Sequence, residues 1–139
     1  MAKSTARGIR VPAELQEQIE REMERRGIGE WSTMVVELLD EAVRMRRAPG
    51  IVFVDGATGR RPVVAGSGLE VWEVVAAWKE VGRNYERLRA AYDWLTEPQL
   101  RAALSYHEMY EAEVESQLER ESQLTLERVQ RELPFTKPR

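Results

Sequence analysis

The hydrophobic pattern at the start of the chain changes from an alternating period to a helical one. Residues 8–11 alternate with Ile9 and Val11 on one side, which predicts a short strand that carries Arg10 on its other face. Pro12 then ends the strand and begins a helix, where its missing N–H is not needed. The apolar stripe of this helix recurs every four residues, at Leu15, Ile19 and Met23.

A second amphipathic helix follows a glycine break. Gly27 and Gly29 interrupt the first helix, and Ser32 is placed to cap the second. The apolar face of the second helix is formed by Val35, Leu38, Leu39 and Ala42. One strand and two short helices bury too little surface to close a core. We therefore expect two copies to pair their strands into an antiparallel ribbon above four interlocked helices.

This pattern resembles the ribbon-helix-helix family of DNA-binding proteins, the Arc- and MetJ-like group. In that family the paired strands enter the major groove, and their outward side chains contact base edges. The resemblance implies outward positions at Ala6, Gly8 and Arg10, and a phosphate contact by the backbone amides of Ser32 and Thr33. Arg10 suits a guanine edge, because its guanidinium can meet O6 and N7 together. Since Ala6 and Gly8 are too small to read bases, sequence readout by the ribbon rests on Arg10.

Composition and charge narrow the class of protein. The chain has 139 residues, of which 32% are charged and 42% hydrophobic, as in one or two small globular domains. It has no cysteine, which excludes disulfides and thiolate metal sites. No apolar run reaches the length of a membrane span and the N-terminus lacks a signal-peptide core, so we expect a cytoplasmic protein without a membrane partner. The net charge of −3 argues against nonspecific coating of nucleic acid.

The charges are unevenly distributed. Residues 1–12 carry Lys3, Arg7 and Arg10 and no acid, whereas residues 108–121 carry six glutamates and one arginine. A basic arm on an otherwise acidic protein confines phosphate contacts to one edge. The alternative is a solvated terminal tail, but here the cations belong to a patterned strand. We therefore expect Lys3, Arg7, Gly8 and Arg10 to contact DNA.

The next segment alternates turn signals with short apolar runs. After a short linker, residues 51–65 combine a β-branched run, a glycine-containing turn and a second apolar run, which predict a β-hairpin. We expect three helices to follow, beginning near Leu69, after the cap residue Asn84, and at the capping box of residues 96–99. The apolar stripe of the third helix runs to Leu118, further than a small bundle can cover. Its far end is therefore expected to pack against another chain or another part of the dimer.

A second resemblance is carried by residues 49–56, 59–66, 71–75 and 100–106. They look like an antitoxin-associated domain of otherwise unknown function, in which a β-hairpin precedes a three-helix, helix-turn-helix-like bundle. Members are predicted VapB-type antitoxins, encoded beside toxins with a PIN-like ribonuclease fold. The third helix is acidic and would be repelled by phosphates, so we interpret the domain as a dimerisation or partner-docking module rather than a second DNA reader.

The last segment, residues 122–139, intersperses apolar and cationic residues and contains two prolines that break a helix. Such a segment can be mobile alone and become ordered on a partner. PIN-like ribonucleases hold a divalent metal with clustered acids, and the resemblance implies that an antitoxin arginine enters that cluster. The predicted toxin-binding residues are Leu124, Arg128, Arg131, Leu133 and Phe135. The alternative is a frayed tail without a partner.

Few residues suit catalysis. His107, the single histidine, lies on an apolar stripe and is expected to be packed rather than to act as a base or ligand. Glu111 and Glu115 belong to a solvated acidic face without converging partners. The glycines of the hairpin turn lack the ending of a phosphate-binding loop. Arg60 and Arg61, which follow them, are interpreted as solvated, with contacts to a DNA backbone or a partner's carboxylates as the alternative. We expect no enzyme activity, no cofactor and no metal site.

The sequence as a whole predicts a mainly α protein with short β elements. A ribbon-helix-helix domain (1–48) forms the dimer, a β-hairpin and three-helix bundle (49–121) follow, and a tail (122–139) binds the toxin. The predicted function is that of an antitoxin of a type II toxin–antitoxin system. It would bind operator DNA as a homodimer, repress its own transcription and neutralise a PIN-like ribonuclease. One alternative is a stand-alone ribbon-helix-helix repressor whose later helices bind an effector or extend the dimer. Another is an interaction protein that has lost DNA binding.

Overall fold

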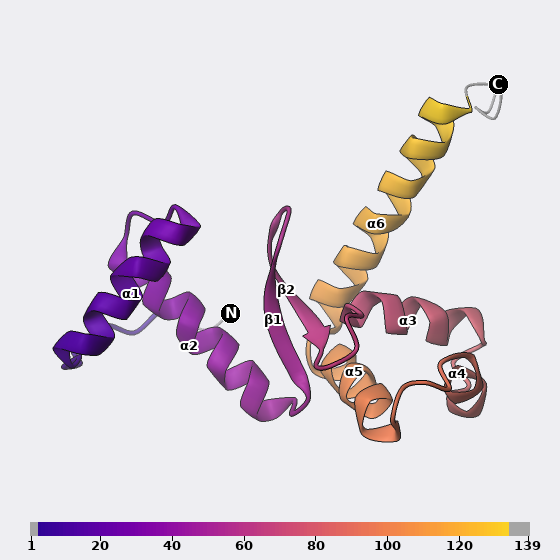
Figure 1. The fold of residues 1–139 in the computed structure, drawn as a ribbon, viewed down its shortest axis with the longest axis horizontal. Coiled ribbons are helices and arrows are strands. Elements are labelled where there is room, and N and C mark those ends of the chain that lie inside the picture. Colours follow the sequence, from indigo (N-terminus) through magenta and orange to yellow (C-terminus); the bar gives the residue numbers. More distant parts are fainter. Residues whose placement is uncertain (1–2, 134–139) are drawn as a thin grey trace. The chain divides into compact units, whose positions relative to one another are not determined.

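The computed structural model describes residues 3–133, which form six helices and one two-stranded sheet (Figure 1). In chain order the elements are α1 (Ala13–Arg26), α2 (Trp31–Arg47), β1 (Ile51–Gly56), β2 (Gly59–Val64), α3 (Val71–Glu80), α4 (Tyr85–Ala91), α5 (Glu97–Met109) and α6 (Glu111–Glu132). The predicted mainly α class with short β elements is confirmed. Within the described range, no helix has both the length and the apolar character needed to cross a lipid bilayer.

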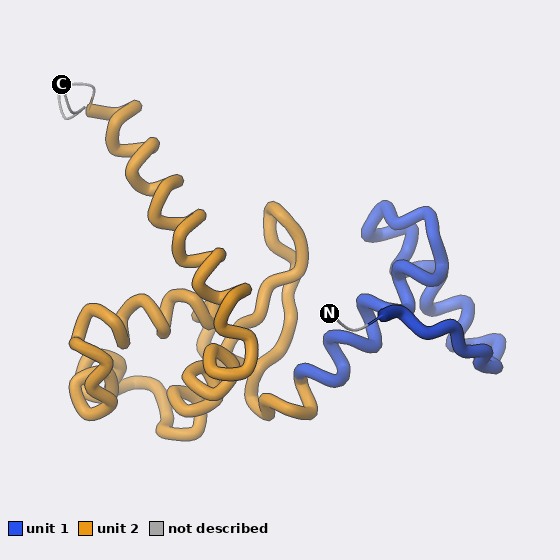
Figure 2. The backbone as a smooth tube through the Cα atoms, turned by 180° about the vertical axis from the view of Figure 1, so that it is seen from behind, with its two compact units in different colours: residues 1–44 blue, residues 45–139 orange. Residues whose placement is uncertain are grey.

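Two compact units divide the chain, residues 1–44 and residues 45–139 (Figure 2). The division falls within the last turn of α2. The first domain boundary predicted from the sequence lies a few residues later, after residue 48.

Unit 1 contains α1 and most of α2. Gly27 ends α1 in the left-handed conformation (φ 67°), which glycine adopts without steric cost. The backbone N–H of Ile28 then donates to the carbonyl oxygen of Met23 at 2.9 Å and closes the helix end. An ion pair of 2.8 Å between Arg26 and Glu37 joins the two helices across this turn.

The start of α2 differs from the prediction at Ser32. The helix begins at Trp31, and the backbone N–H of Met34 donates to the carbonyl oxygen of Glu30 at 3.2 Å. Ser32 is therefore the second residue of the helix and cannot be its cap. The hydroxyl of Thr33 donates to the side chain of Glu30 at 3.1 Å, so these two residues hold the first turn together.

Residues 3–12 carry neither helix nor strand in this single chain. A strand is defined by its hydrogen-bonded partner, and the partner predicted for residues 8–11 is the same segment of a second copy. The paired ribbon therefore stays a prediction.

Unit 2 opens with the predicted hairpin. β1 and β2 pair antiparallel, from Ile51 opposite Val64 to Gly56 opposite Gly59, which confirms both strands. Ile51 and Val64 are buried in the core of the unit, whereas the other end of the hairpin is more exposed.

Helix α3 lies at the centre of the helical part of unit 2. Val71, Val74 and Val75 are fully buried there, because the helix packs against β2, α4, α5 and α6. The predicted caps are confirmed: the side chain of Asn84 accepts from the N–H of Arg87 at the start of α4. At the start of α5, Thr96 and Gln99 form the reciprocal capping box, with Pro98 in the first turn.

The predicted third helix is two helices. The apolar stripe predicts a single helix through Leu118, but the backbone leaves the helical conformation at Tyr110 (φ −128°, ψ 43°), which separates α5 from α6. No proline or glycine marks this break, so its cause lies in tertiary packing. The change of direction buries Val114 of α6 in the same core as Tyr106 of α5, and the rings of Tyr106 and Tyr110 lie 4.8 Å apart at the bend.

Helix α6 extends into the last segment. It continues across residue 121, the predicted domain boundary, as far as Glu132, so residues 122–132 are helical. The i,i+4 pair of Arg128 with Glu132 supports this part of the helix, and the hydroxyl of Thr125 donates to the carbonyl oxygen of Glu121. The C-terminal half extends away from the rest of unit 2 (Figure 2).

Candidate functional site

The residues predicted to bind DNA lie on two elements of unit 1, and all are exposed. Lys3, Arg7, Gly8 and Arg10 precede α1, whereas Ser32 and Thr33 lie in the first turn of α2. No ion-pair partner is found for the three cations within residues 3–133. Their charges are therefore available to phosphates, and no bond within the described part of unit 1 joins them to the first turn of α2.

The residues predicted to bind a toxin lie on the projecting half of α6. Leu124, Leu126, Val129 and Leu133 are each at least 40% exposed, which is unusual for so many aliphatic side chains in one short segment. Arg128 and Arg131 are exposed on the same helix, and Arg128 pairs with Glu132 at 3.1 Å. Phe135, the remaining predicted anchor, lies outside the described residues.

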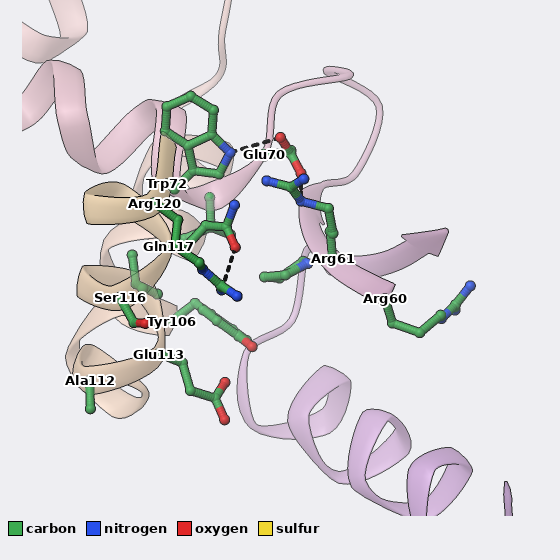
Figure 3. Close-up of a pocket in the computed structure, with 13 residues that line it drawn as sticks. Arg60, Arg61, Glu70, Trp72, Tyr106, Ala112, Glu113, Ser116, Gln117 and Arg120 are labelled. Atoms are coloured by element: carbon green, nitrogen blue, oxygen red, sulfur yellow. Dashed lines mark hydrogen bonds and ion pairs between the residues drawn. The ribbon is translucent and has the colours of Figure 1, made fainter. Parts of the chain in front are cut away.

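Unit 2 also contains a cavity of about 380 Å³ bounded by β2, the start of α3, and α6 (Figure 3). Val71, Tyr106 and Val114 form its floor, and each is almost completely buried. Trp72 and Pro62 continue the apolar lining. Charged and amide side chains surround this lining, mainly Arg61 and Glu70 on one side and the residues of α6 on the other.

A chain of polar contacts joins the hairpin to α3 and α6 beside this cavity. Arg61 of β2 pairs with Glu70, the residue before α3, and with Glu121 of α6 at 2.5 Å. Glu70 also accepts from the indole N–H of Trp72 at 2.7 Å, as Figure 3 shows. Gln117 donates to Glu121 at 2.8 Å and accepts from Arg120 at 2.8 Å. The network therefore fixes the side chains on one side of the cavity.

The position of Arg61 depends on Gly56, which lies next to the turn of the hairpin. A Cβ atom on Gly56 would lie 2.8 Å from Cγ of Arg61 and closer still to its Cδ. Such a contact is far inside van der Waals distance. The stem of Arg61 thus occupies the space that any side chain at position 56 would need.

A second cluster of charged groups lies where α3, α5 and α6 meet. Nζ of Lys79 contacts both carboxylate oxygens of Glu115, at 2.6 and 2.5 Å, and Nε2 of His107 lies 2.8 Å from one of them. The hydrogen bond from Lys79, followed by that from His107, lowers the pKa of the Glu115 carboxyl.

This cluster corrects one prediction and bears on another. Glu115 does have converging partners, contrary to the prediction, because the bend at Tyr110 brings α6 back beside His107. The ligand atoms of His107, Glu111 and Glu115 lie within 4.8 Å of one another, an arrangement that could hold a cation. Lys79 already supplies a positive charge to Glu115, so we assign no metal here. His107 is buried and packs edge-on against Trp78, as expected.

The role of the hairpin arginines differs from the prediction. Arg61 is predicted to be solvated, yet its side chain is 16% exposed and bound by two carboxylates of its own chain. Arg60 likewise donates to Asp55 and to the carbonyl oxygen of Phe53, both at 3.0 Å. The arginines themselves are visible in the sequence, but the partners of Arg61 are distant and carry no local signal.

Comparison with known proteins identifies part of unit 2 and gives no activity. A family model described as a protein of unknown function (DUF433) matches residues 51–107, from the first residue of β1 to His107 of α5. This match covers less than half of the chain. The same comparison finds no curated protein and no solved structure that matches the chain.

Proposed function

We propose that the chain is an antitoxin that binds operator DNA as a homodimer through unit 1 and neutralises a PIN-like ribonuclease toxin through α6. The resemblances of the N-terminal pattern and of unit 2 supply this hypothesis. We further propose that it acts in the cytoplasm, where its operator and the toxin's RNA substrate are found.

The observation that carries the dimer is the uncovered apolar surface of unit 1. Ile9 is 62% exposed, and Val36, Leu39 and Val43 on α2 are 64%, 57% and 54% exposed. Only two hydrophobic side chains of the described part of unit 1 are buried, Ile19 and Met34. A helix pair that leaves several of its aliphatic residues in water needs another surface to cover them. A second copy of the unit supplies that surface.

DNA binding is supported by the charges next to this surface. The cations Lys3, Arg7 and Arg10 are exposed and have no ion-pair partner in residues 3–133, and residues 1–12 contain no acid. A dimer presents this basic segment twice, and two copies are typical of proteins that recognise paired half-sites. Toxin binding is supported by the exposed aliphatic side chains of residues 124–133, of which Leu124 and Leu126 are the most exposed.

The proposal is tested by two matched substitutions in the full chain, Leu39→Lys in unit 1 and Leu124→Lys on α6. Both replace an exposed leucine of a helix, so neither creates a cavity. Sedimentation analysis, a gel shift on the DNA upstream of the gene, and co-purification with the product of the neighbouring gene are the measurements.

Leu39→Lys is expected to give a monomer that no longer binds DNA tightly. Leu124→Lys is expected to remain dimeric, to bind DNA normally and to release the neighbouring protein. A wild-type chain that sediments as a monomer would contradict the dimer. A neighbour that is not a ribonuclease, or that never co-purifies, would leave the stand-alone repressor as the better description.

A further inference from the structure

The cavity between β2, α3 and α6 has the dimensions and lining of a small-molecule site. Its volume of about 380 Å³ falls in the range of roughly 300–1,000 Å³ that is typical of ligand pockets. The floor is made by Val71, Tyr106 and Val114, which are 0%, 1% and 3% exposed, so the apolar surface is held rigidly by the core. The ring of Trp72 forms one wall.

The arginines around this lining differ in whether a carboxylate of the same chain neutralises their charge. Arg61 is bound by the carboxylates of Glu70 and Glu121, and Arg60, which also lines the cavity, is bound by the carboxylate of Asp55. Arg120 donates only to the uncharged amide oxygen of Gln117, and no carboxylate pairs with it in the part of the chain that the structure describes. Within residues 3–133, the guanidinium of Arg120 is therefore the positive charge at the cavity that is not neutralised.

The position of Glu113 limits the charge of a ligand. It lines the cavity on the same helix as Arg120, seven residues earlier, which is about 10 Å along a helix axis. A ligand with an anionic group at the Arg120 end keeps that group away from Glu113. A second anionic group at the other end would lie beside the carboxylate of Glu113, so a ligand with a single anionic group suits the cavity best.

We propose that this cavity binds a small apolar monocarboxylate, with its hydrocarbon or aromatic group on the Val71, Tyr106 and Val114 floor and its carboxylate on Arg120. A guanidinium and a carboxylate can form two parallel hydrogen bonds, which makes the pair both strong and directional. The inference does not depend on DNA or toxin binding, because the site lies entirely within unit 2.

The test is calorimetric titration of the full chain with two probes of equal size, 3-phenylpropionate and the uncharged 3-phenylpropanamide. We expect one binding site per chain and an affinity about tenfold higher for the acid than for the amide, equivalent to about 1.4 kcal/mol. In Arg120→Gln the acid is expected to bind no better than the amide. Arg89→Gln removes an exposed arginine of α4 outside the cavity and is expected to keep the preference.

A second variant tests the location of the site. Ser116 is exposed and lines the cavity, so Ser116→Phe places a ring there without disturbing the core. Binding of both probes should disappear while the thermal unfolding of the chain is unchanged. Equal affinity for acid and amide, no saturation by either probe in the millimolar range, or equal losses in Arg120→Gln and Arg89→Gln would overturn the proposal.

Discussion

Arg61 and Glu121 lie sixty residues apart in the sequence, and their side chains form an ion pair of 2.5 Å that ties the hairpin to α6. The two side chains are 16% and 23% exposed, so the pair is largely removed from solvent. The second carboxylate on Arg61, that of Glu70, lies next to α3. One guanidinium therefore links three elements of unit 2.

Neutralising Glu121 should destabilise the chain. Glu121→Gln leaves the Arg61 guanidinium with one carboxylate, and a poorly satisfied, largely buried group costs about 1–3 kcal/mol. We expect the free energy of unfolding in urea to fall by that amount. Glu119→Gln makes the same charge change at an exposed position of α6 and should have little effect. Equal losses in the two variants would show that the ion pair contributes nothing.

The cluster around Glu115 predicts a loss of stability in acid. Hydrogen bonds from Lys79 and His107 lower the pKa of Glu115 in the folded chain. A lowered folded-state pKa adds stability that is present above the unfolded pKa and is lost as the pH falls through the folded value. Urea midpoints measured below pH 5 should therefore decline more steeply in the wild type than in Glu115→Gln. Parallel pH profiles for the two chains would contradict the assignment.

Arg10 should carry most of the base recognition of the proposed DNA interface. Arg10→Ala is expected to weaken operator binding by about 1–3 kcal/mol for each bidentate arginine–guanine pair that it removes, measured by gel shift at a fixed salt concentration. Arg101→Ala is the control, because that arginine is exposed but belongs to α5, where it pairs with Glu97. Unchanged affinity in Arg10→Ala would remove this residue from its proposed role.

Ending the chain after Glu121 should separate the two proposed activities. The removed part of α6 is mostly exposed, and the ion pair of Glu121 with Arg61 is retained, so the core of unit 2 should stay folded. The shortened protein is expected to bind operator DNA with unchanged affinity and to stop protecting RNA from the toxin. Full protection by the shortened protein would show that the toxin binds elsewhere.

The parts of the fold that can be predicted from the sequence are those specified by nearby residues. The hairpin follows from two β-branched runs around a glycine turn, and the Asn84 and Thr96 caps act on amides three residues away. The prediction of Ser32 as a cap is wrong because the carbonyl group of Glu30 accepts the first hydrogen bond of the helix. The preference of serine for cap positions does not show that the helix begins two residues earlier.

The candidate sites depend on contacts that no local pattern specifies. The bend at Tyr110 has no glycine or proline, and it alone brings Glu115 to His107 and Val114 to the core. The cavity likewise needs β2, the start of α3 and α6 to come together. The pairing of Arg61 in the hairpin with Glu121 in a distant helix is decided only when the chain packs.

Gly56 gives this packing an unexpected point of vulnerability. The turn of a hairpin is ordinarily where evolution and engineering find the greatest freedom to vary a sequence. Here an added methyl group would strike the stem of Arg61 and push its guanidinium off the carboxylates of Glu70 and Glu121. Gly56, which has no side chain, thus determines how firmly α6 is held to the hairpin, because the link between them is made by Arg61.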